Sequence, residues 1–346
     1  MDTPTVISVD MDYFDWNISY PAITLCPLYK TNVTVFKEIV RDKFNETGLK
    51  VDKYLWAITQ ANFETLHYVV LDVPEELRSV FHPNEYANIA ESMFQKFGGN
   101  VSTKTNHNVT IVSAMTELGM CHVLNSNVAV FDDPRKWNVS NTKYFKNNIE
   151  LSIYDRDFFI QISKYADIFK VYIHSPDEII TGTTSSFTVD MEAAISFGLS
   201  VWTTRISEEL RQMPLAIRKC RFINEATSAR YPIYSYSHCI LECRIDVIKT
   251  LCGCVPHFYK PLAHENICHI EQLKCLVKYK KEILTLSSSE ATKKYPNLPS
   301  NSRDCGCLST CELDQYHKDR EDVTSRTYVN TLDIGITSFP KYEVEG

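Results

Sequence analysis

The sequence predicts an α+β fold, in which strands and helices occupy separate stretches of the 346-residue chain. Strand-like segments lie near the start, in the middle and at the end, whereas helix-like segments lie between residues 31 and 97. Ten of the twelve cysteines fall between Cys220 and Cys311, which marks a separate, cross-linked region. This segregation favours α+β over a doubly wound fold, in which strands and helices alternate.

The strand predictions rest on β-branched residues and on the alternation of apolar and polar side chains. Residues 5–9 and 22–25 are rich in β-branched residues, and Pro21 and Pro27 flank the second of these segments. Alternation gives a strand one apolar face, so we expect sheets with a buried side. Further segments with strand periodicity are residues 109–113, 150–162, 168–174 and 332–337.

Two helices are predicted between these strands. From Thr31 onwards, apolar residues recur at steps of three and four positions with Lys and Glu between them, which indicates an amphipathic helix. A second helix is expected over residues 84–97, where the same spacing continues to Phe97. The pair Gly98–Gly99 would then end this helix.

Charge and hydropathy exclude several classes of protein. The chain has 36 basic and 43 acidic residues, a net charge of −7, and therefore lacks the basic surface that nucleic-acid binding requires. No stretch approaches the roughly 18 apolar residues of a membrane-spanning helix. The residues after Met1 are mostly polar, so we predict no signal peptide.

Two features nevertheless indicate an extracellular protein. The cysteine count is even and the cysteines are clustered, as in disulfide-linked secreted domains. Asn-x-Ser/Thr sequons are also in excess, since chance gives about three in this composition. We predict glycosylation at Asn17, Asn32, Asn45, Asn100, Asn108 and Asn138.

The spacing of the cysteines suggests a nested order of disulfides. Cys239 and Cys243 are four residues apart, so on a helix they lie on one face. A returning segment would meet the inner cysteine first and the outer one next. This geometry favours the pairs Cys243–Cys305 and Cys239–Cys307, with Cys220–Cys311 outside them. Spacing alone does not determine connectivity, and it leaves Cys252, Cys254, Cys268 and Cys275 unassigned.

Zinc binding is the alternative for these cysteines, because closely spaced thiolates are common zinc ligands. Ten clustered cysteines with few histidines at ligand spacing do not form one set of four ligands. The sequons also favour an oxidising compartment. We therefore predict disulfides and expect neither a metal nor a cofactor.

Five segments resemble, in the same order, motifs of the degenerin/epithelial sodium channel family. The resemblance extends from about residue 5 to residue 340, and the sequons together with residues 218–220 favour its insect pickpocket branch. The segments are residues 20–26 (YPAITLC), 117–126 (ELGMCHVLNS), 171–178 (VYIHSPDE), 234–254 (beginning YSYSHC and ending CGC) and 305–311 (CGCLSTC).

This resemblance implies a hand-like ectodomain within the α+β class and a complete set of disulfides. The implied subdomains are wrist and palm strands at 1–30, a mostly helical finger at 31–108, β-ball, palm and knuckle at 109–215, a cysteine-rich thumb at 216–311 and a returning palm strand at 312–346. The implied pairs are Cys26–Cys121, Cys220–Cys311, Cys239–Cys307, Cys243–Cys305, Cys252–Cys275 and Cys254–Cys268.

The resemblance also implies a function. Family members are trimeric, amiloride-blockable sodium (cation) channels of the plasma membrane, opened by ligands, protons or force and not by voltage. We expect this chain to be the extracellular gating domain of such a subunit, in a homo- or heterotrimer with related subunits and with an unknown extracellular ligand. The membrane helices and the filter that conducts sodium would lie outside residues 1–346.

A secreted, disulfide-rich binding protein is the alternative function. Apolar segments of about 20 residues encoded on both sides of the chain would identify the channel instead. A hydrolase is disfavoured, because the sequence shows no nucleophile with a matching base and orienting group. We therefore do not expect an enzyme.

Three acidic residues near the start form a candidate ion-attracting site. Asp10, Asp12 and Asp15 would lie at the wrist if the resemblance holds, where acidic residues raise the local cation concentration. The simpler interpretation is a solvated strand edge. His174 and the tyrosines that precede the thumb helix are expected to be ordinary structural residues.

Overall fold

The computed structural model describes most of the chain. The described residues are 8–10, 17–32, 34–35, 38, 48–69, 81–104, 107–139, 142–155, 158–286, 304–325, 329–338 and 343–345. Within them, no helix combines the length and the apolar character needed to cross a membrane.

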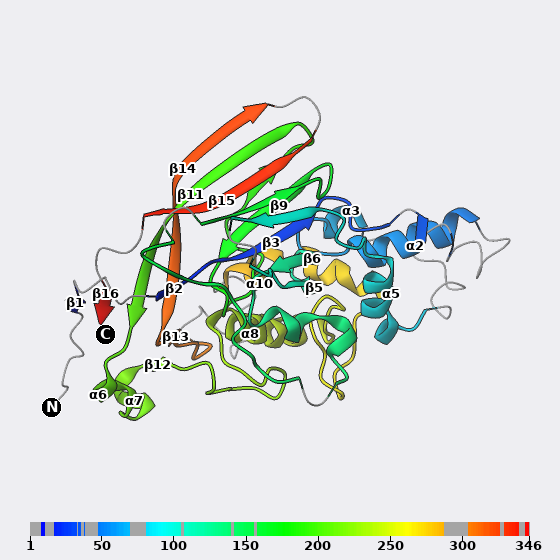
Figure 1. Cartoon of the computed structure of the whole chain (residues 1–346). Helices are drawn as coiled ribbons and strands as arrows, with labels where there is room; N and C mark the ends of the chain where they lie inside the picture. Colours follow the sequence, from blue (N-terminus) through cyan, green and yellow to red (C-terminus); the bar gives the residue numbers. More distant parts are fainter. Residues whose placement is uncertain are drawn as a thin grey trace.

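The largest sheet is built around the long strand β11 (Ala193–Arg205). β14 (Leu313–Ser325) pairs antiparallel with it along its whole length. On the other side of β11, β15 (Thr331–Ser338) and β16 (Glu343–Glu345) pair in parallel, and β16 also pairs with β1 (Ser8–Asp10). β8 (Phe159–Ser163) and β4 (Asn100–Thr103) complete the sheet beyond β15. Figure 1 shows β1 and β16 together at one end of the molecule.

The second sheet has the order β10-β9-β3-β6-β5. Every residue of β3 and of β6 is buried, so both faces of these strands are covered instead of one face being exposed to solvent. Tyr20 joins the two sheets, because its hydroxyl donates to the Ile334 carbonyl over 2.7 Å inside the core. The strands of this sheet are β10 (Phe187–Val189), β9 (Phe169–His174), β3 (Ala22–Pro27), β6 (Gly119–Leu124) and β5 (Ile111–Thr116).

Two short strand pairs lie outside both sheets. β2 (Asn17–Ser19) pairs with β7 (Glu150–Ser152), and β12 (Cys220–Arg221) pairs with β13 (Ser309–Thr310).

Most helices lie on one side of these sheets and share one hydrophobic core with β5 and β6 (Figure 1). The helices of this core are α2 (Gly48–Gln60), α3 (Leu66–Val69), α5 (Tyr86–Met93), α8 (Tyr236–Cys252), α9 (Leu273–Lys278) and α10 (Lys280–Thr285). Short helices α6 (Glu208–Arg211) and α7 (Leu215–Arg218) lie near β12, and single 3-10 turns are η2 (Pro83–Glu85), η3 (Ala129–Asp132), η4 (Pro134–Lys136) and η5 (Ile270–Gln272). The strands and helices thus occupy separate parts of the structure, as the predicted α+β class requires.

Both ends of α8 are set by local chemistry. Ser235 is the N-cap, and its hydroxyl accepts from the His238 backbone N–H. At the other end Gly253 has a φ of 73°, a left-handed conformation that glycine adopts without a steric cost. Cys239 and Cys243 therefore lie one turn apart on a stable helix, as the sequence predicted.

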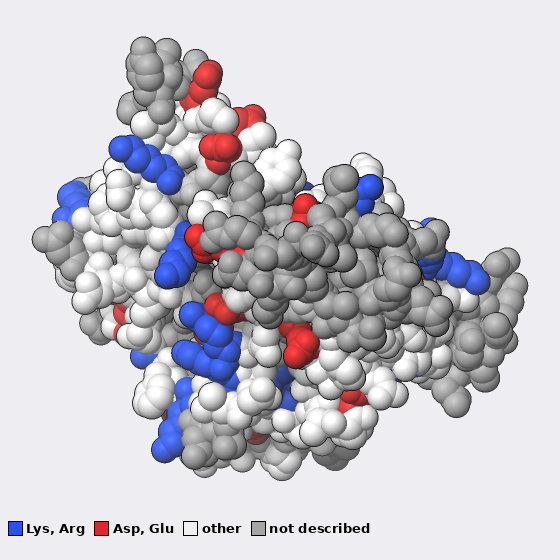
Figure 2. All heavy atoms as spheres, turned by 90° about the vertical axis from the view of Figure 1, so that its right-hand side faces the viewer, with Lys and Arg blue, Asp and Glu red and all other residues white. Residues whose placement is uncertain are grey.

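The face of the molecule at the α2–α5 end has mixed charge. Figure 2 shows Lys, Arg, Asp and Glu side chains of both signs interspersed among the described residues of this face. Charged side chains of the described residues also pair across elements, for example Lys170 of β9 with Glu64. Such a surface is typical of a solvated protein face.

Some predicted boundaries were wrong. The helix predicted over 84–97 ends at Met93, because Phe94 is extended and forms an isolated β-bridge with Thr31. The segment 150–162 contains two strands, β7 and β8, separated by a turn. The sequence did not predict α2, β11 or β14. Most of the helix predicted from Thr31, and residues 5–7 of the first strand, lie outside the described residues.

Lys30 is a buried lysine directly after the β3 segment. Only 5% of its surface is exposed, and its ammonium lies 3.6 Å from the Sγ of Cys121. Burial lowers the pKa of Lys30 to about 7; the nearby Glu64 opposes this shift and Lys170 adds to it. The unfolded chain therefore binds more protons than the folded chain between pH 7 and the ordinary lysine pKa, and stability rises with pH over that range.

We predict that Lys30→Met removes this pH dependence. Relative to the variant, the wild-type chain should gain about 2–4 kcal/mol of unfolding free energy between pH 7 and pH 10. Urea denaturation without reductant, at pH 6.5 and 9.5, measures the difference. Lys143→Met, at an exposed lysine, is the matched control. Parallel pH curves for wild type and Lys30→Met would contradict the prediction.

Candidate functional site

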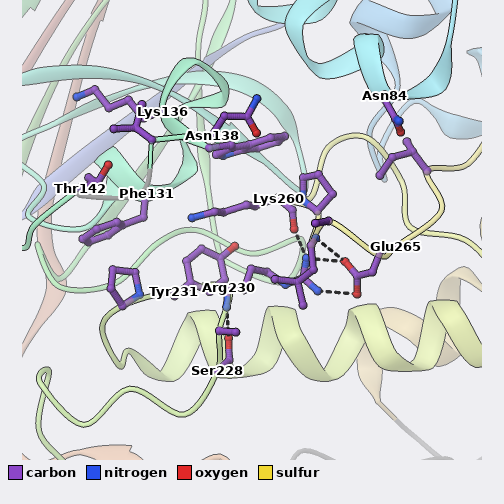
Figure 3. Close-up of a pocket in the computed structure, with 18 residues that line it drawn as sticks. Asn84, Phe131, Lys136, Asn138, Thr142, Ser228, Arg230, Tyr231, Lys260 and Glu265 are labelled. Atoms are coloured by element: carbon purple, nitrogen blue, oxygen red, sulfur yellow. Dashed lines mark hydrogen bonds and ion pairs between the residues drawn. The ribbon is translucent and has the colours of Figure 1, made fainter.

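A pocket of about 580 Å³ lies where three segments distant in sequence meet (Figure 3). The first segment contains η3 and η4, the second comprises residues 228–232 before α8, and the third comprises residues 260–267 after it. We call this the α8 pocket. Its size falls within the range of small-ligand sites, roughly 300–1,000 Å³.

Arg230 forms the floor of the α8 pocket and is almost fully buried. Its two terminal nitrogens donate to the two carboxylate oxygens of Glu265, each over 2.9 Å. Its Nε donates to Glu242 on α8 over 3.0 Å, and it also donates to the Lys260 carbonyl. This bidentate geometry holds the guanidinium in one orientation.

Glu265 completes a neutral cluster beneath the pocket. It accepts from the Leu262 backbone N–H over 2.8 Å and pairs with Lys249 of α8 at 3.1 Å. Burial by itself would raise the pKa of Glu265, but hydrogen bonds from Arg230, Leu262 and Lys249 outweigh it and lower the pKa to about 2. Two cations and two carboxylates thus neutralise one another, and the cluster joins both flanking loops to α8.

A second polar network stands behind one wall of the pocket. The Tyr231 hydroxyl donates to Asp132 over 3.1 Å, and Asp132 also contacts His238 Nε2 at 2.9 Å. His238 Nδ1 lies 2.7 Å from the Ser235 hydroxyl. This order of Ser, His and Asp is that of hydrolase triads. Ser235 is completely buried and caps α8, however, so this hydroxyl has a structural role and meets no substrate.

Lys260 is the cation that enters the pocket itself. Figure 3 shows its side chain extending between Asn138 and Tyr231. The ammonium lies 5.5 Å from the centroid of the Tyr231 ring, within the range of a cation–π contact. Burial lowers the pKa of Lys260, Asp132 and Glu242 oppose the shift, and Arg230 adds to it.

This arrangement is suited to binding. The floor is neutral and rigid, aromatic rings form the walls, and an ammonium enters the space. Among the described residues, no group of three or more His, Cys, Asp or Glu side chains could hold a metal ion.

The structure pairs all twelve cysteines, in the six pairs that the family resemblance implied. Cys239–Cys307 and Cys243–Cys305 join α8 to the segment that leads into β14. Cys252–Cys275 and Cys254–Cys268 lie at the other end of α8, Cys26–Cys121 joins β3 to β6, and Cys220–Cys311 joins β12 to the residue after β13. The disulfides thus connect α8 to both neighbouring loops and to the large sheet.

The predicted glycosylation residues are dispersed. Asn17, Asn100, Asn108 and Asn138 are exposed, which glycosylation requires. Asn32 is half-buried, and its side chain accepts from the Thr34 backbone N–H over 3.0 Å. Asn138 also lines the α8 pocket. Asn45 lies outside the described residues.

The predicted acidic site is described only in part. Asp10 lies in β1 directly opposite Glu343 of β16, whereas Asp12 and Asp15 lie outside the described residues. The strand pairing therefore places two further acidic residues, Glu343 and Glu345, in the strand beside β1, and the sequence analysis did not include them. Only the register of two strands from opposite ends of the chain makes these positions neighbours.

The aromatic residues and His174 have structural partners. Tyr234 donates to the Leu308 carbonyl, and Tyr231 takes part in the network described above. Tyr236 is the first residue of α8 instead of a residue before it. His174 contacts the Thr24 hydroxyl at 2.8 Å, and burial lowers its pKa to about 4, against the opposing effect of its backbone hydrogen bonds.

Sequence reasoning missed the residues of the pocket. Arg230, Lys260 and Glu265 carry no motif, and each lies in a loop. Their only signal is proximity to the cysteine-rich region, where Cys254 and Cys268 close a small loop around the last two.

Comparison with known proteins gives a consistent result. The sequence model of the family described as amiloride-sensitive sodium channel matches residues 1–338. The chain is similar to Pickpocket protein 11 of Drosophila melanogaster, with 27% identity over 160 residues, which are 46% of this chain and 28% of that protein. It is also similar to the sodium channel protein Nach of Drosophila virilis, with 24% identity over 156 residues, and of Drosophila ananassae, with 23% over 162 residues. These matches cover 45% and 46% of this chain, and 37% and 28% of the two Nach proteins. The chain thus spans well under half the length of these relatives.

We predict that Glu265→Gln strongly destabilises the chain at neutral pH. The change leaves Arg230 buried without its bidentate partner, which typically costs about 3–5 kcal/mol. Because the folded pKa of Glu265 lies below its unfolded value of 4.5, the wild-type stabilisation is complete above pH 4.5 and is lost as pH falls towards 2. The difference from wild type should therefore shrink on acidification.

Urea denaturation at pH 7, 4.5 and 3.5 measures this difference. Glu209→Gln, at an exposed residue of α6, is the control and should leave stability unchanged at each pH. A gap between wild type and Glu265→Gln that stays constant with pH would show that the ion pair does not carry the effect.

Proposed function

The chain belongs to the amiloride-sensitive sodium channel family, and from this premise we propose that it is the extracellular gating domain of a channel subunit. The observation that carries the proposal is the family match over residues 1–338. Six disulfides and the excess of sequons support an extracellular position, because disulfides persist in oxidising compartments. In this proposal the full-length protein resides in the plasma membrane and conducts sodium.

We further propose that the subunit assembles as a homo- or heterotrimer with related subunits, and that the channel is amiloride-sensitive and opens in response to an extracellular ligand or mechanical force. The fold supports a hand-like division. Residues 216–311 would be the thumb built around α8, 31–108 the finger containing α2 and α5, and 109–215 the β-ball, palm and knuckle. Residues 1–30 and 312–346 would supply the wrist and the remaining palm strands, including β1, β14, β15 and β16.

A continuous set of contacts leads from the α8 pocket to the end of the large sheet. The ion-pair cluster joins the pocket to α8, and two disulfides join α8 to the segment that enters β14. The first residue of β14, Leu313, pairs with Thr204 of β11, and Thr204 also pairs with Val344 of β16. We propose that a displacement of α8 reaches β16 and β1 along this route.

β1 and β16 would be the parts of the domain next to the pore. The start of β14 is also tied to β2, because Asp314 accepts from the Ser19 backbone N–H over 2.8 Å and Tyr316 donates to the Ser19 carbonyl over 2.6 Å. Several strands at this end are therefore connected by hydrogen bonds that a shift of β14 would affect together.

We predict that removing the Cys239–Cys307 tether weakens channel activity. The full-length protein that contains this chain should produce an amiloride-sensitive sodium current. The double variant Cys239→Ala/Cys307→Ala should lower that current per surface channel by about 5-fold or more, the lower end of usual coupling energies. Whole-cell recording with surface biotinylation measures both quantities, and enzymatic deglycosylation of the same surface protein tests the sequons.

The matched control is Cys252→Ala/Cys275→Ala. This disulfide lies at the opposite end of α8 and does not connect the helix to β14. Its removal should change the current per channel less than removal of Cys239–Cys307 does. Equal currents in the two variants would contradict the proposed route, and the absence of any amiloride-sensitive current from the wild type would contradict the proposed function.

We predict that the acidic residues near β1 raise sodium conductance. Neutralising Asp10, Asp12 and Asp15 together should lower single-channel conductance by about 1.5-fold or more at 10 mM salt, where charges act over roughly 30 Å. The effect should fade at 1 M salt. The control is Asp190→Asn/Glu192→Gln, beside the opposite end of β11. An unchanged conductance at low salt would rule out the acidic site.

A further inference from the structure

The charged side chains on the floor of the α8 pocket already neutralise one another, so they offer a ligand no unpaired charge. Arg230 donates to Glu265, Glu242 and a carbonyl, and Glu265 is further satisfied by Lys249 and a backbone N–H. These groups set the shape of the pocket. Recognition must come from the groups above them.

Lys260 differs from the floor because, among the described residues, its ammonium forms no ion pair. The carboxylates nearest to it are engaged elsewhere, since Asp132 binds Tyr231 and His238 and Glu242 binds Arg230 and Ser228. In the described part of the chain, none of these carboxylates forms an ion pair with the Lys260 ammonium. An ammonium partly withdrawn from water without a partner is costly, and an anion in the pocket would relieve that cost.

Aromatic and proline rings form part of the wall around this ammonium. Phe131 is 2% exposed, the Tyr231 ring lies beside the ammonium, and Trp137 and Pro261 also line the pocket, among polar residues such as Asn138 and Thr142. Figure 3 shows the rings of Phe131 and Tyr231 on the same side of the pocket as the Lys260 nitrogen. Such surfaces pack well against an aromatic or branched apolar group.

We propose that the α8 pocket binds a small organic acid, whose carboxylate pairs with the Lys260 ammonium and whose aromatic or branched body packs between Phe131, Tyr231 and Trp137. A second lysine, Lys136, lies on the exposed side of the pocket and adds to the attraction for an anion. The ligand class is therefore acidic and partly apolar. Neutral and cationic molecules of the same shape should bind more weakly, because they leave the ammonium without a partner.

This ligand would also tie together the three segments that form the pocket. It would contact η3 through Phe131, the segment before α8 through Tyr231 and the loop after α8 through Lys260. Binding would favour whichever arrangement of α8 keeps these segments closest. This last step, from binding to gating, rests on the proposed function, whereas the binding itself does not.

Phenylacetate is the probe, compared with acetate, 2-phenylethanol and phenethylamine in isothermal titration calorimetry on the glycosylated chain. Phenylacetate should bind at least 10-fold more tightly than the other three. Lys260→Met should weaken phenylacetate binding at least 10-fold, and Lys260→Arg, which keeps the charge, should stay within about 3-fold of wild type. Lys278→Met, at an exposed lysine of α9 outside the pocket, is the control and should bind as wild type.

Equal binding of phenylacetate and 2-phenylethanol, or unchanged binding in a folded Lys260→Met variant, would overturn the proposal. Folding of each variant is checked by its thermal transition without reductant. Phenylacetate applied to the full-length channel then separates the two proposals. If phenylacetate binds to the chain but does not change the current, the binding site is supported and gating through it is contradicted. If phenylacetate does not bind to the chain, the binding site is contradicted and the assignment as a channel subunit is unaffected.

Discussion

The arrangement of the helices around the second sheet depends on one buried carboxylate, that of Glu117 in the turn between β5 and β6. Its side chain is fully buried and accepts from Arg244 of α8, from the Tyr259 hydroxyl and from the Gly182 backbone N–H. Its backbone carbonyl also accepts from Phe63, at the end of the α2 region, over 3.1 Å. Because an isolated buried charge is very costly, all of these partners must be in place for the core to close. Burial, reinforced by the Glu117 charge, raises the pKa of Tyr259 well above its usual range, so this phenol remains a donor.

Arg244 extends the same constraint to the far side of the helical core. It donates to the Leu284 carbonyl over 2.7 Å at the end of α10 and to the Thr183 hydroxyl over 3.2 Å. Gly182 fits here because an added Cβ would lie 2.9 Å from the Leu284 side chain. The β5–β6 turn, α8, α10 and the 179–184 loop are therefore positioned by one charge pair. A neutral replacement of either partner would leave the other charged and buried without its partner, which is why the pair specifies this packing and does more than stabilise it.

The sequence predicted those parts of the fold that depend on local pattern or on cysteine order. It predicted β15 from its alternation, the spacing of Cys239 and Cys243 was compatible with a helix, and the family resemblance implied the thumb helix and the disulfide pairs. It failed where distant segments decide the outcome. Helix α5 ends early because Phe94 pairs with Thr31, a contact that no local pattern shows. Strand β14 was missed because it is a charged edge strand exposed over most of its length, which protects an edge from aggregation but hides the strand period. Glu117 and Arg244 are 127 positions apart, so their pairing is visible only in three dimensions.

α8 contributes charged residues to two separate ion-pair clusters, and their positions on the helix determine how it can move. Arg244 pairs with Glu117, whereas Glu242 and Lys249 pair with Arg230 and Glu265, which line the α8 pocket. Residues two positions apart on a helix point in different directions, so Glu242 and Arg244 reach separate sites from one turn. A rotation of α8 about its axis would break charge pairs in a dry interior on both sides at once. A displacement in which the β5–β6 turn, α10 and the bonded loops move together with α8 breaks neither set, and the Cys239–Cys307 and Cys243–Cys305 disulfides would transfer that displacement to the start of β14. The costs of the two motions thus differ by several charged hydrogen bonds, each worth about 1.5–3 kcal/mol, and the rigid-body motion is the one that the structure permits.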